Sequence, residues 1–211
     1  MNKKVHIIGI SGGSSSGKTY LCNNLMNQFE DIDILQIKLD SYYFDLKHLS
    51  MEEREKNNFD HPSAFDFNLL NKHLNQIKNN LIAKIPIYDY TTHTRKSEYT
   101  IIDKEYCLIL VEGILSLYDE QIRNMMSFSV YIDISNDIRK QRRIKRDLNS
   151  RERTFESISK QYKNTVEPMY MKYIEPTKIF SDIIINEISN KDKGYIKLLD
   201  KINTIINNYE K

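Results

Sequence analysis

The clearest chemical signal in the chain is the stretch GGSSSGKT at residues 12–19. A glycine, four further residues, a glycine, a lysine and a threonine form the pattern of a loop that holds nucleotide phosphates, if a strand precedes it and a helix follows. Backbone N–H groups of such a loop curl around phosphate oxygens, and the amino end of the helix adds partial positive charge. Lys18 is expected against the β- and γ-phosphates, and the Thr19 hydroxyl on Mg²⁺. The residues expected to bind the phosphates of a nucleoside triphosphate are Gly12, Gly13, Ser14, Ser15, Ser16, Gly17, Lys18 and Thr19.

Two acidic residues follow later apolar runs and should reach the same edge of a parallel sheet. Asp40 ends the run at 33–39, where a carboxylate could take the proton of a substrate hydroxyl that attacks the γ-phosphorus. The pattern fits a turn cap equally well. Glu112 ends the run at 106–111 and could hold Mg²⁺ directly or through water, its alternative being an ordinary surface carboxylate.

Arginine is concentrated in one short window. Six of the nine arginines lie between Arg139 and Arg153, where eight basic and two acidic residues give a net charge of +6. Arginine forms bidentate bonds to phosphate, so the window is interpreted as a lid that closes over a nucleotide. A solvated basic face and a nucleic-acid patch remain alternatives.

The elements that must position these residues alternate between strand and helix. The sequence predicts strands at 4–10, 33–39, 106–111, 129–133 and 180–186, and helices at 18–29, 50–56, 67–80, about 136–148, 155–172 and 194–208. This alternation indicates an α/β fold with a parallel sheet flanked by helices, in a single domain over residues 1–211. Residues 84–102 interrupt it as a predicted β-hairpin insertion, and the lid is placed at about 139–161.

Composition excludes several classes of protein. The 211 residues contain no apolar run long enough for a membrane helix, and the N-terminus lacks the cleavage site of a signal peptide. Two cysteines make no disulfide framework, so a cytoplasmic location is expected. A formal charge of +2 argues against bulk binding of nucleic acid. A GTPase is disfavoured because residues 190–193, NKDK, carry lysine where the guanine-reading motif needs aspartate.

Seven motifs in one order extend the interpretation beyond the phosphate loop. They are GISGGSSSGKT, LDSYY, NFDHPSAFD, IPIYDYTTHTR, LVEGIL, RRIKRD and EPTK. With them the chain resembles the uridine–cytidine kinase family over about residues 5–186. The resemblance implies a P-loop NTPase fold of the nucleoside kinase type and transfer of the γ-phosphate of ATP or GTP to the 5′-hydroxyl of uridine or cytidine. It also implies a homo-oligomer, a tetramer in this family.

The resemblance assigns further roles residue by residue. It implies that Asp40 is the catalytic base, working with Lys18 and with arginines at positions 143 and 146. The implied catalytic set is Asp40, Lys18, Arg143 and Arg146, and the lid positions Arg146 and Arg151 are added to the ATP site. The implied nucleoside site is Asp40, Tyr43, Phe59, Asp60, Tyr88, Tyr90, His93, Arg143, Arg153 and Gln161. Without the resemblance, Tyr43, Tyr88 and Phe59 would be interpreted as packing residues and His93 as an exposed turn residue.

Some positions depart from the family pattern, and other functions stay open. Glu152 replaces the usual lid glycine and places a negative charge between two arginines, while Leu39 replaces the usual glutamine before Asp40. Phosphoribulokinase and pantothenate kinase share the general core but lack the pairing of NFDHP with YDYTTHTR. A non-catalytic nucleotide-binding module that docks RNA on its arginine face is the remaining alternative.

Overall fold

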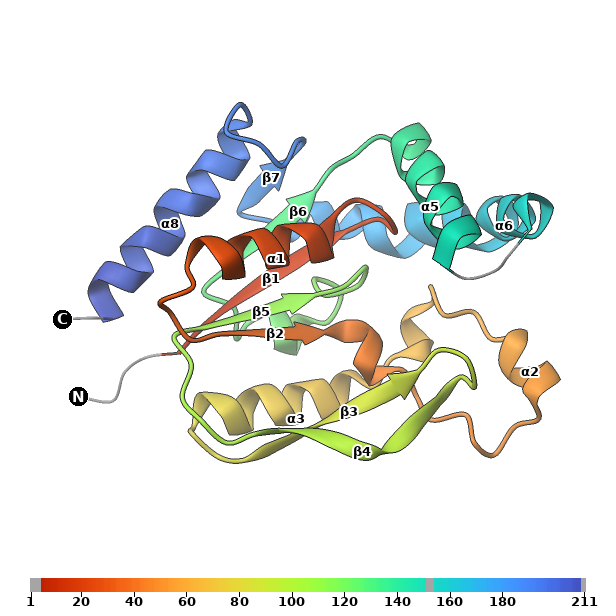
Figure 1. Ribbon diagram of the computed structural model, residues 1–211, viewed down its shortest axis with the longest axis horizontal. Helices are drawn as coiled ribbons and strands as arrows, with labels where there is room; N and C mark the ends of the chain where they lie inside the picture. Colours follow the sequence, from red (N-terminus) through yellow and green to blue (C-terminus); the bar gives the residue numbers. More distant parts are fainter. Residues whose placement is uncertain (1–4, 151–153, 210–211) are drawn as a thin grey trace.

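The computed structural model describes residues 5–150 and 154–209 and is built around a parallel sheet (Figure 1). The sheet has five strands in the order β2-β5-β1-β6-β7. They are β1 (His6–Gly12), β2 (Ile34–Lys38), β5 (Leu108–Glu112), β6 (Phe128–Ile132) and β7 (Ile183–Ile185). All neighbouring strands run parallel. The apolar runs of the central strands β1, β5 and β6 reflect burial on both faces. The predicted α/β fold is confirmed.

Two hydrophobic cores lie on opposite faces of this sheet, because successive side chains of a strand point to opposite sides. Ile7 joins the core beneath α3 (Phe67–Lys78), whereas Ile8 joins the core beneath α1 (Lys18–Gln28) and α8 (Lys193–Tyr209). The remaining α-helices are α2 (Met51–Glu55), α4 (Glu120–Arg123), α5 (Asn136–Ser150), α6 (Phe155–Gln161) and α7 (Glu167–Met169). The sequence missed α4, which has a single turn.

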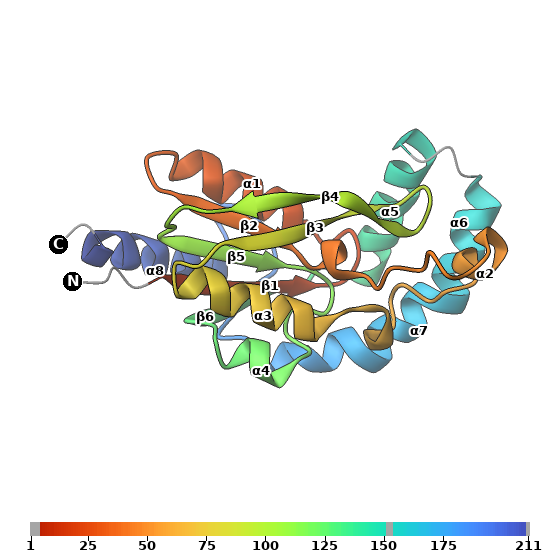
Figure 2. The same cartoon turned by 90° about the horizontal axis from the view of Figure 1, so that it is seen from below.

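The predicted hairpin is present as a separate two-stranded sheet of β3 (Ala83–Asp89) and β4 (Thr94–Ile102). It lies beside α3, and its tip reaches the end of the molecule that carries α5 and α6 (Figure 2). A register shift between Pro86 and Tyr88 interrupts the strand pairing. The hairpin therefore brings residues 88–95 to the edge of the main sheet where the strands end.

The predicted helix at 155–172 is wrong as one α-helix. After α6 the chain passes through a π turn (Tyr162–Val166), α7, a second π turn (Tyr170–Ile174) and a 3-10 helix (Glu175–Phe180). Each π turn ends two residues before a proline, at Pro168 and Pro176. Proline has no N–H to donate and its ring crowds the preceding turn, so the helix cannot stay regular there.

Three smaller features complete the description of the fold. Ser50 caps α2 through a capping box with Glu53, which fixes the start of this short charged helix. Cys22 and Cys107 are both buried, and neither takes part in a disulfide. Within residues 5–150 and 154–209, every helix is too short or too polar to span a lipid bilayer.

Candidate active site

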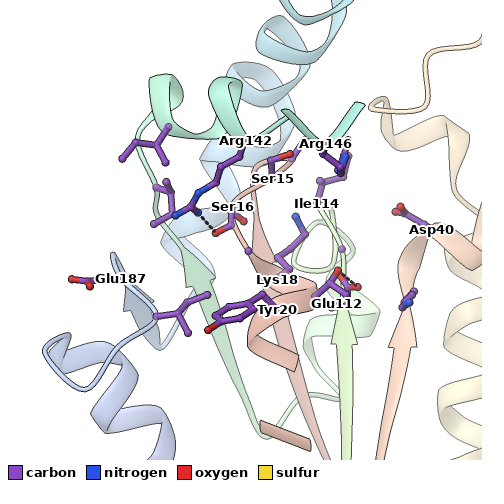
Figure 3. A pocket seen from close by; sticks show the side chains of 18 of the residues that line it. Ser15, Ser16, Lys18, Tyr20, Asp40, Glu112, Ile114, Arg142, Arg146 and Glu187 are labelled. Atoms are coloured by element: carbon purple, nitrogen blue, oxygen red, sulfur yellow. Dashed lines mark hydrogen bonds between the residues drawn. The ribbon is translucent and has the colours of Figure 1, made fainter. Parts of the chain in front are cut away.

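A cleft of about 1030 Å³ opens at the carboxyl ends of the strands. Its lining comes from residues 14–20, the ends of β2 and β5, α5 and the loop after β7. Asp40 lies on one side and Glu187 on the other, with Lys18 and Glu112 between them (Figure 3). Open parallel sheets bind their ligands at this edge, so the cleft is the candidate site.

The phosphate loop, residues 12–19, connects β1 to α1 as the motif requires. Gly17 has φ 107° and Ser15 has φ 62°, left-handed values that curl the backbone into a concave turn. Lys18 reaches back across this turn, and its Nζ donates to the carbonyls of Gly12 at 2.9 Å and Gly13 at 3.0 Å. Its charge is thereby held at the centre of the loop.

Lys18 is buried, and its surroundings pull its pKa in two directions. Burial lowers the pKa of the ammonium group, since the charged form loses hydration. The carboxylates of Glu112 and Asp40 oppose that effect. The two acids that the sequence singled out therefore both lie close enough to act on the lysine of the phosphate loop.

Glu112 and Thr19 form a pair of oxygen ligands. Glu112 ends β5 opposite Ile10 of β1, and its Oε1 accepts hydrogen bonds from Thr19 Oγ1 at 3.0 Å and Gln36 Nε2 at 3.3 Å. No cluster of three or more histidine, cysteine or acidic side chains suited to a metal occurs in the described ranges. One hydroxyl and one carboxylate are the kind of sparse oxygen site that fits Mg²⁺ when substrate phosphates complete the shell.

Asp40 is presented by a short 3-10 helix, η1 (Leu39–Tyr42), that follows β2. The flanking Leu39 and Tyr42 are fully buried, and the Tyr42 hydroxyl contacts Nδ1 of the buried His73 at 3.1 Å. Because its neighbours point into the core, Asp40 faces the cleft (Figure 3). Leu39, which departs from the family pattern, is a packing residue here.

Arginines of α5 contact the phosphate loop. Arg143 Nη1 donates to Ser14 Oγ at 2.9 Å, and its Nη2 donates to Gln161 Oε1 at 3.2 Å. Gln161, predicted near the base, thus lies against an arginine. The fully buried Asp147 binds Arg143 at 3.5 Å and Arg146 at 2.8 Å. The sequence missed Asp147, although its spacing of four from Arg143 is the signal of a helical ion pair.

Arg142, Arg151 and Arg153 also belong to the arginine-rich stretch between residues 139 and 153. Arg142 lines the cleft and its Nη1 donates to the Ser16 carbonyl at 3.4 Å, a contact that the sequence did not assign. Arg151 and Arg153, predicted for the ATP and nucleoside sites, lie outside the described residues, as does Glu152.

An aromatic cluster lies beside the cleft on the Asp40 side. It consists of Tyr43, Phe59, Phe65, Tyr88, Tyr90 and His93. Tyr43 stands at its centre, with ring centroids 5.1 Å from Phe59, 4.4 Å from Phe65 and 5.2 Å from Tyr88. The sequence missed Phe65. Tyr90 extends the cluster to the cleft, which it lines while 52% exposed.

Two members of the aromatic cluster offer polar atoms. The Tyr88 hydroxyl is buried without a hydrogen-bond partner among the described residues, and burial raises the pKa of Tyr88 to about 12, so it stays a donor. His93, at the hairpin tip, has φ 53° and stacks on Phe59 at 4.8 Å. Burial holds the pKa of His93 below its usual value, so the ring is neutral near pH 7.

Asp60 is 8% exposed and lies near three cations. Burial raises the pKa of its carboxyl group, while Arg143, Lys18 and Arg146 act in the opposite direction. These cations belong to the phosphate loop and α5, so Asp60 lies within electrostatic range of both.

Arg95 and Arg54 hold the aromatic cluster in place, and the sequence singled out neither. Arg95 on β4 donates from Nε to the Tyr43 carbonyl at 2.9 Å and pairs with Asp66 at 3.2 Å. Arg54 on α2 donates from Nη1 to the Thr92 carbonyl at 3.0 Å. The sequence did offer one indication of a role for Arg95, because it is the last residue of the motif IPIYDYTTHTR.

The end of the cleft away from Asp40 was also not predicted. Its lining residues are Tyr20, Ile138, Asn186, Glu187 and Ile188. A nucleotide whose γ-phosphate faces Asp40 must direct its base toward this end.

Comparison with known proteins gives a consistent result. The model of the phosphoribulokinase/uridine kinase family matches residues 7–193. A uridine kinase of Streptococcus agalactiae serotype V is 47% identical over 205 residues, which are 97% of this chain and 95% of that protein. A uridine kinase of Anoxybacillus flavithermus is 45% identical over 206 residues, 98% and 97% of the two chains.

Solved structures share the fold at low identity. A possible uridine kinase from Bacillus stearothermophilus has TM-score 0.57 and 23% identity, covering 88% of this chain and 91% of that one. A phosphoribulokinase from Rhodobacter spheroides has TM-score 0.66 and 16% identity, covering 92% and 75%. A putative fructose transport system kinase from Silicibacter has TM-score 0.70 and 16% identity, covering 87% and 90%.

Proposed function

The chain belongs to the phosphoribulokinase/uridine kinase family, and from that premise we propose that it is a uridine/cytidine kinase. It transfers the γ-phosphate of ATP or GTP to the 5′-hydroxyl of uridine or cytidine and so forms UMP or CMP, a step of pyrimidine salvage. The observation that carries the proposal is the position of Asp40, which lies in one cleft with the phosphate loop and on the side of the aromatic cluster.

The reaction needs one proton transfer and one displacement. The Asp40 carboxylate accepts the proton of the 5′-hydroxyl as that oxygen forms a bond to the γ-phosphorus. The bond from the γ-phosphorus to the β–γ bridging oxygen breaks, and the nucleoside diphosphate leaves with that electron pair. Lys18, Arg143 and Arg146 hold positive charge around the transferring group, where negative charge is redistributed.

Mg²⁺ would be held by Thr19 and Glu112, whose oxygens already adjoin at 3.0 Å. When bound with the nucleotide, the ion offsets phosphate charge. The backbone of the phosphate loop and the hydroxyls of Ser14, Ser15 and Ser16 surround the phosphates. Arg151 supplies further positive charge to the nucleotide in this proposal.

The nucleoside is held from the aromatic cluster. Asp60 accepts hydrogen bonds from the ribose hydroxyls, and its raised pKa reflects a buried acid that a ligand with two donors would stabilise. Tyr43, Phe59 and Tyr90 offer flat apolar surface for the base. Tyr88 and His93 contact the polar edge of the pyrimidine, with Arg153 and Gln161 nearby in the proposal.

The test is release of ADP or GDP with ATP and GTP as donors and a panel of acceptors: uridine, cytidine, ribulose 5-phosphate and pantothenate. Turnover that requires uridine or cytidine is expected, because a sugar phosphate or a pantothenate chain has no flat base for the aromatic cluster. If only ribulose 5-phosphate or pantothenate is phosphorylated, the proposed activity is wrong and the chain has the activity of another related kinase. Salt-sensitive RNA binding without nucleoside-dependent turnover would favour the non-catalytic module.

Three further expectations accompany this function. They are a single kinase domain over residues 1–211, a cytoplasmic location and a homotetrameric assembly. The mass measured by light scattering during gel filtration tests the assembly. A mass of about four chains supports the tetramer, and a mass of one 25.1 kDa chain contradicts it.

A further inference from the structure

Arg139 on α5 is a charged side chain with no role in the proposed reaction. It is 2% exposed and belongs to the largest fully buried side chains of the described residues. Within residues 5–150 and 154–209, it forms no ion pair with a carboxylate. A buried charge without a counterion is costly, so its retention calls for a physical account.

The guanidinium is fixed on two sides. Its Nε donates to the Ile134 carbonyl at 3.0 Å, its Nη2 donates to Asn136 Oδ1 at 3.4 Å, and its carbon lies 3.7 Å from the centroid of the Tyr170 ring. Asn136 is itself fixed, since its Oδ1 accepts from the Tyr162 hydroxyl at 2.5 Å. Tyr162 and Tyr170 begin the two π turns after α6. The irregular helix therefore anchors the arginine.

The remaining nitrogen faces the phosphate loop. Arg139 Nη1 is buried and has no hydrogen-bond partner among the described residues. A Cβ atom built on Gly13 would lie 2.2 Å from this Nη1 and 2.7 Å from the guanidinium carbon. The φ of Gly13 is not in the left-handed region, so the close approach of Arg139, and not the backbone angle, is what demands glycine here.

We propose that Arg139 is a positioning residue for the donor nucleotide. Its guanidinium is a rigid support under Gly13 that holds the phosphate loop in its binding shape, and its charge lies beneath the bound phosphates. Lysine could supply the charge but not the planar group that stacks on Tyr170 and donates from two nitrogens. The inference rests on the proposed function only in that the phosphate loop binds a nucleoside triphosphate.

The first test compares Arg139→Lys with Lys145→Gln, an exposed basic position on the same helix. For Arg139→Lys, the Kd of MgATP, measured by calorimetry, should rise about 10-fold. Loss of one charged hydrogen bond or stacking contact weakens binding by about that factor. The KM of uridine should stay within about twofold, as should every parameter of Lys145→Gln. Equal rises for both substrates would indicate general loss of structure and overturn the proposal.

A double-mutant cycle isolates the contact itself. Gly13→Ala should weaken MgATP binding because its methyl group meets Nη1, and Arg139→Ala should weaken it by removing the support. Together the two changes should cost less than the product of their separate effects, since the methyl group enters the vacated space. Multiplicative effects would contradict the proposal. If this pattern holds for MgATP but uridine is not phosphorylated, the positioning role stands and the proposed function fails.

Discussion

The donor side of the cleft is built mainly from consecutive residues 12–19, whereas the acceptor side is gathered from residues 40–43, 59–65 and 88–95. The phosphate loop takes much of its shape from its own backbone, with left-handed values at Ser15 and Gly17, and Arg139 supports it from α5 at Gly13. No short sequence motif determines the shape of the aromatic cluster. It depends on Arg95 and Arg54, which join the hairpin to the chain around Tyr43 and to α2.

Substitutions in the two halves are therefore expected to have different effects. A change in the phosphate loop alters a local geometry that many nucleotide-binding proteins share, and its effect should fall on the donor. A change at Arg95 should displace a distant segment and act on the acceptor alone. Asp40 lies where the two halves meet, so only there should a single substitution stop the chemistry while both substrates still bind.

Asp40→Asn should therefore have the largest effect. Loss of the proton acceptor should lower kcat by about 10²–10⁴-fold, a usual contribution of a general base. The Kd values of uridine and MgATP should change little because asparagine has the same shape. Steady-state kinetics with calorimetry measures both, and Asp103→Asn, an exposed position, is the control. A kcat near that of the unchanged protein would remove Asp40 from the role of base.

Glu112→Gln should affect the donor half alone. The substitution keeps the size of the side chain but removes the charge that adjoins Thr19, so the Mg²⁺ concentration for half-maximal rate should rise by about 10–100-fold. A magnesium titration at saturating ATP and uridine measures it. The exposed Glu120 on α4 provides the control, Glu120→Gln. An unchanged Mg²⁺ requirement would leave Glu112 as a structural acid at the end of β5.

Arg95→Met should affect the acceptor half alone. It removes the hydrogen bond to the Tyr43 carbonyl and the ion pair with Asp66, and the KM of uridine should rise about 10-fold for a loss near 1.4 kcal/mol. The KM of MgATP should stay unchanged. Lys96→Met, at the next and exposed position of β4, controls for loss of charge. A rise in both KM values would show that the two halves are not mechanically separate.

Asp60→Asn should have the smallest effect, on stability. Burial raises the pKa of Asp60 above 3.8, so the folded chain binds this proton more tightly than the unfolded chain does. Its contribution to stability is full below pH 3.8 and is lost as the pH rises through the folded pKa. At pH 8 the asparagine variant should melt about 2–4 °C higher, which corresponds to roughly 1 kcal/mol in a chain of this size.

The pH dependence identifies the cause of that stabilisation. The gain in Tm should shrink as the pH falls toward 4, because Asp60 then becomes neutral in the parent protein as well. The KM of uridine should rise in the same variant, since asparagine accepts ribose hydrogen bonds less strongly than a carboxylate. A gain in Tm that is equal at pH 4 and pH 8 would show that the buried charge is not its source.

The sheet and the phosphate loop could be predicted from the sequence, whereas the aromatic cluster could not. Alternation of apolar runs and helices predicted the five parallel strands, because the three central strands, β1, β5 and β6, are buried on both faces. The phosphate loop could be found from spacing alone. Tyr43, Phe59 and Tyr88 meet only after the hairpin has folded beside η1, so spacing indicated packing residues, and only the family resemblance suggested a nucleoside site.

The errors have physical causes of the same kind. The concentration of arginine between Arg139 and Arg153 indicated a single lid, but sequence spacing does not show which of these side chains are buried. Arg139 is in fact buried against Gly13 of the phosphate loop, whereas Arg142 lines the cleft. The prediction of one helix over 155–172 took no account of Pro168, and proline alone does not say whether a helix kinks, stops or passes through a π turn.

The identity of the phosphorylated product, determined by ³¹P NMR after reaction of uridine with MgATP, tests directly whether the 5′-hydroxyl lies beside Asp40. We expect ADP together with a phosphomonoester signal that two C5′ protons split into a triplet. A doublet, which marks phosphate on C2′ or C3′, would place the wrong hydroxyl beside Asp40. ADP and inorganic phosphate without a phosphorylated nucleoside would contradict the assignment of the aromatic cluster as the acceptor site.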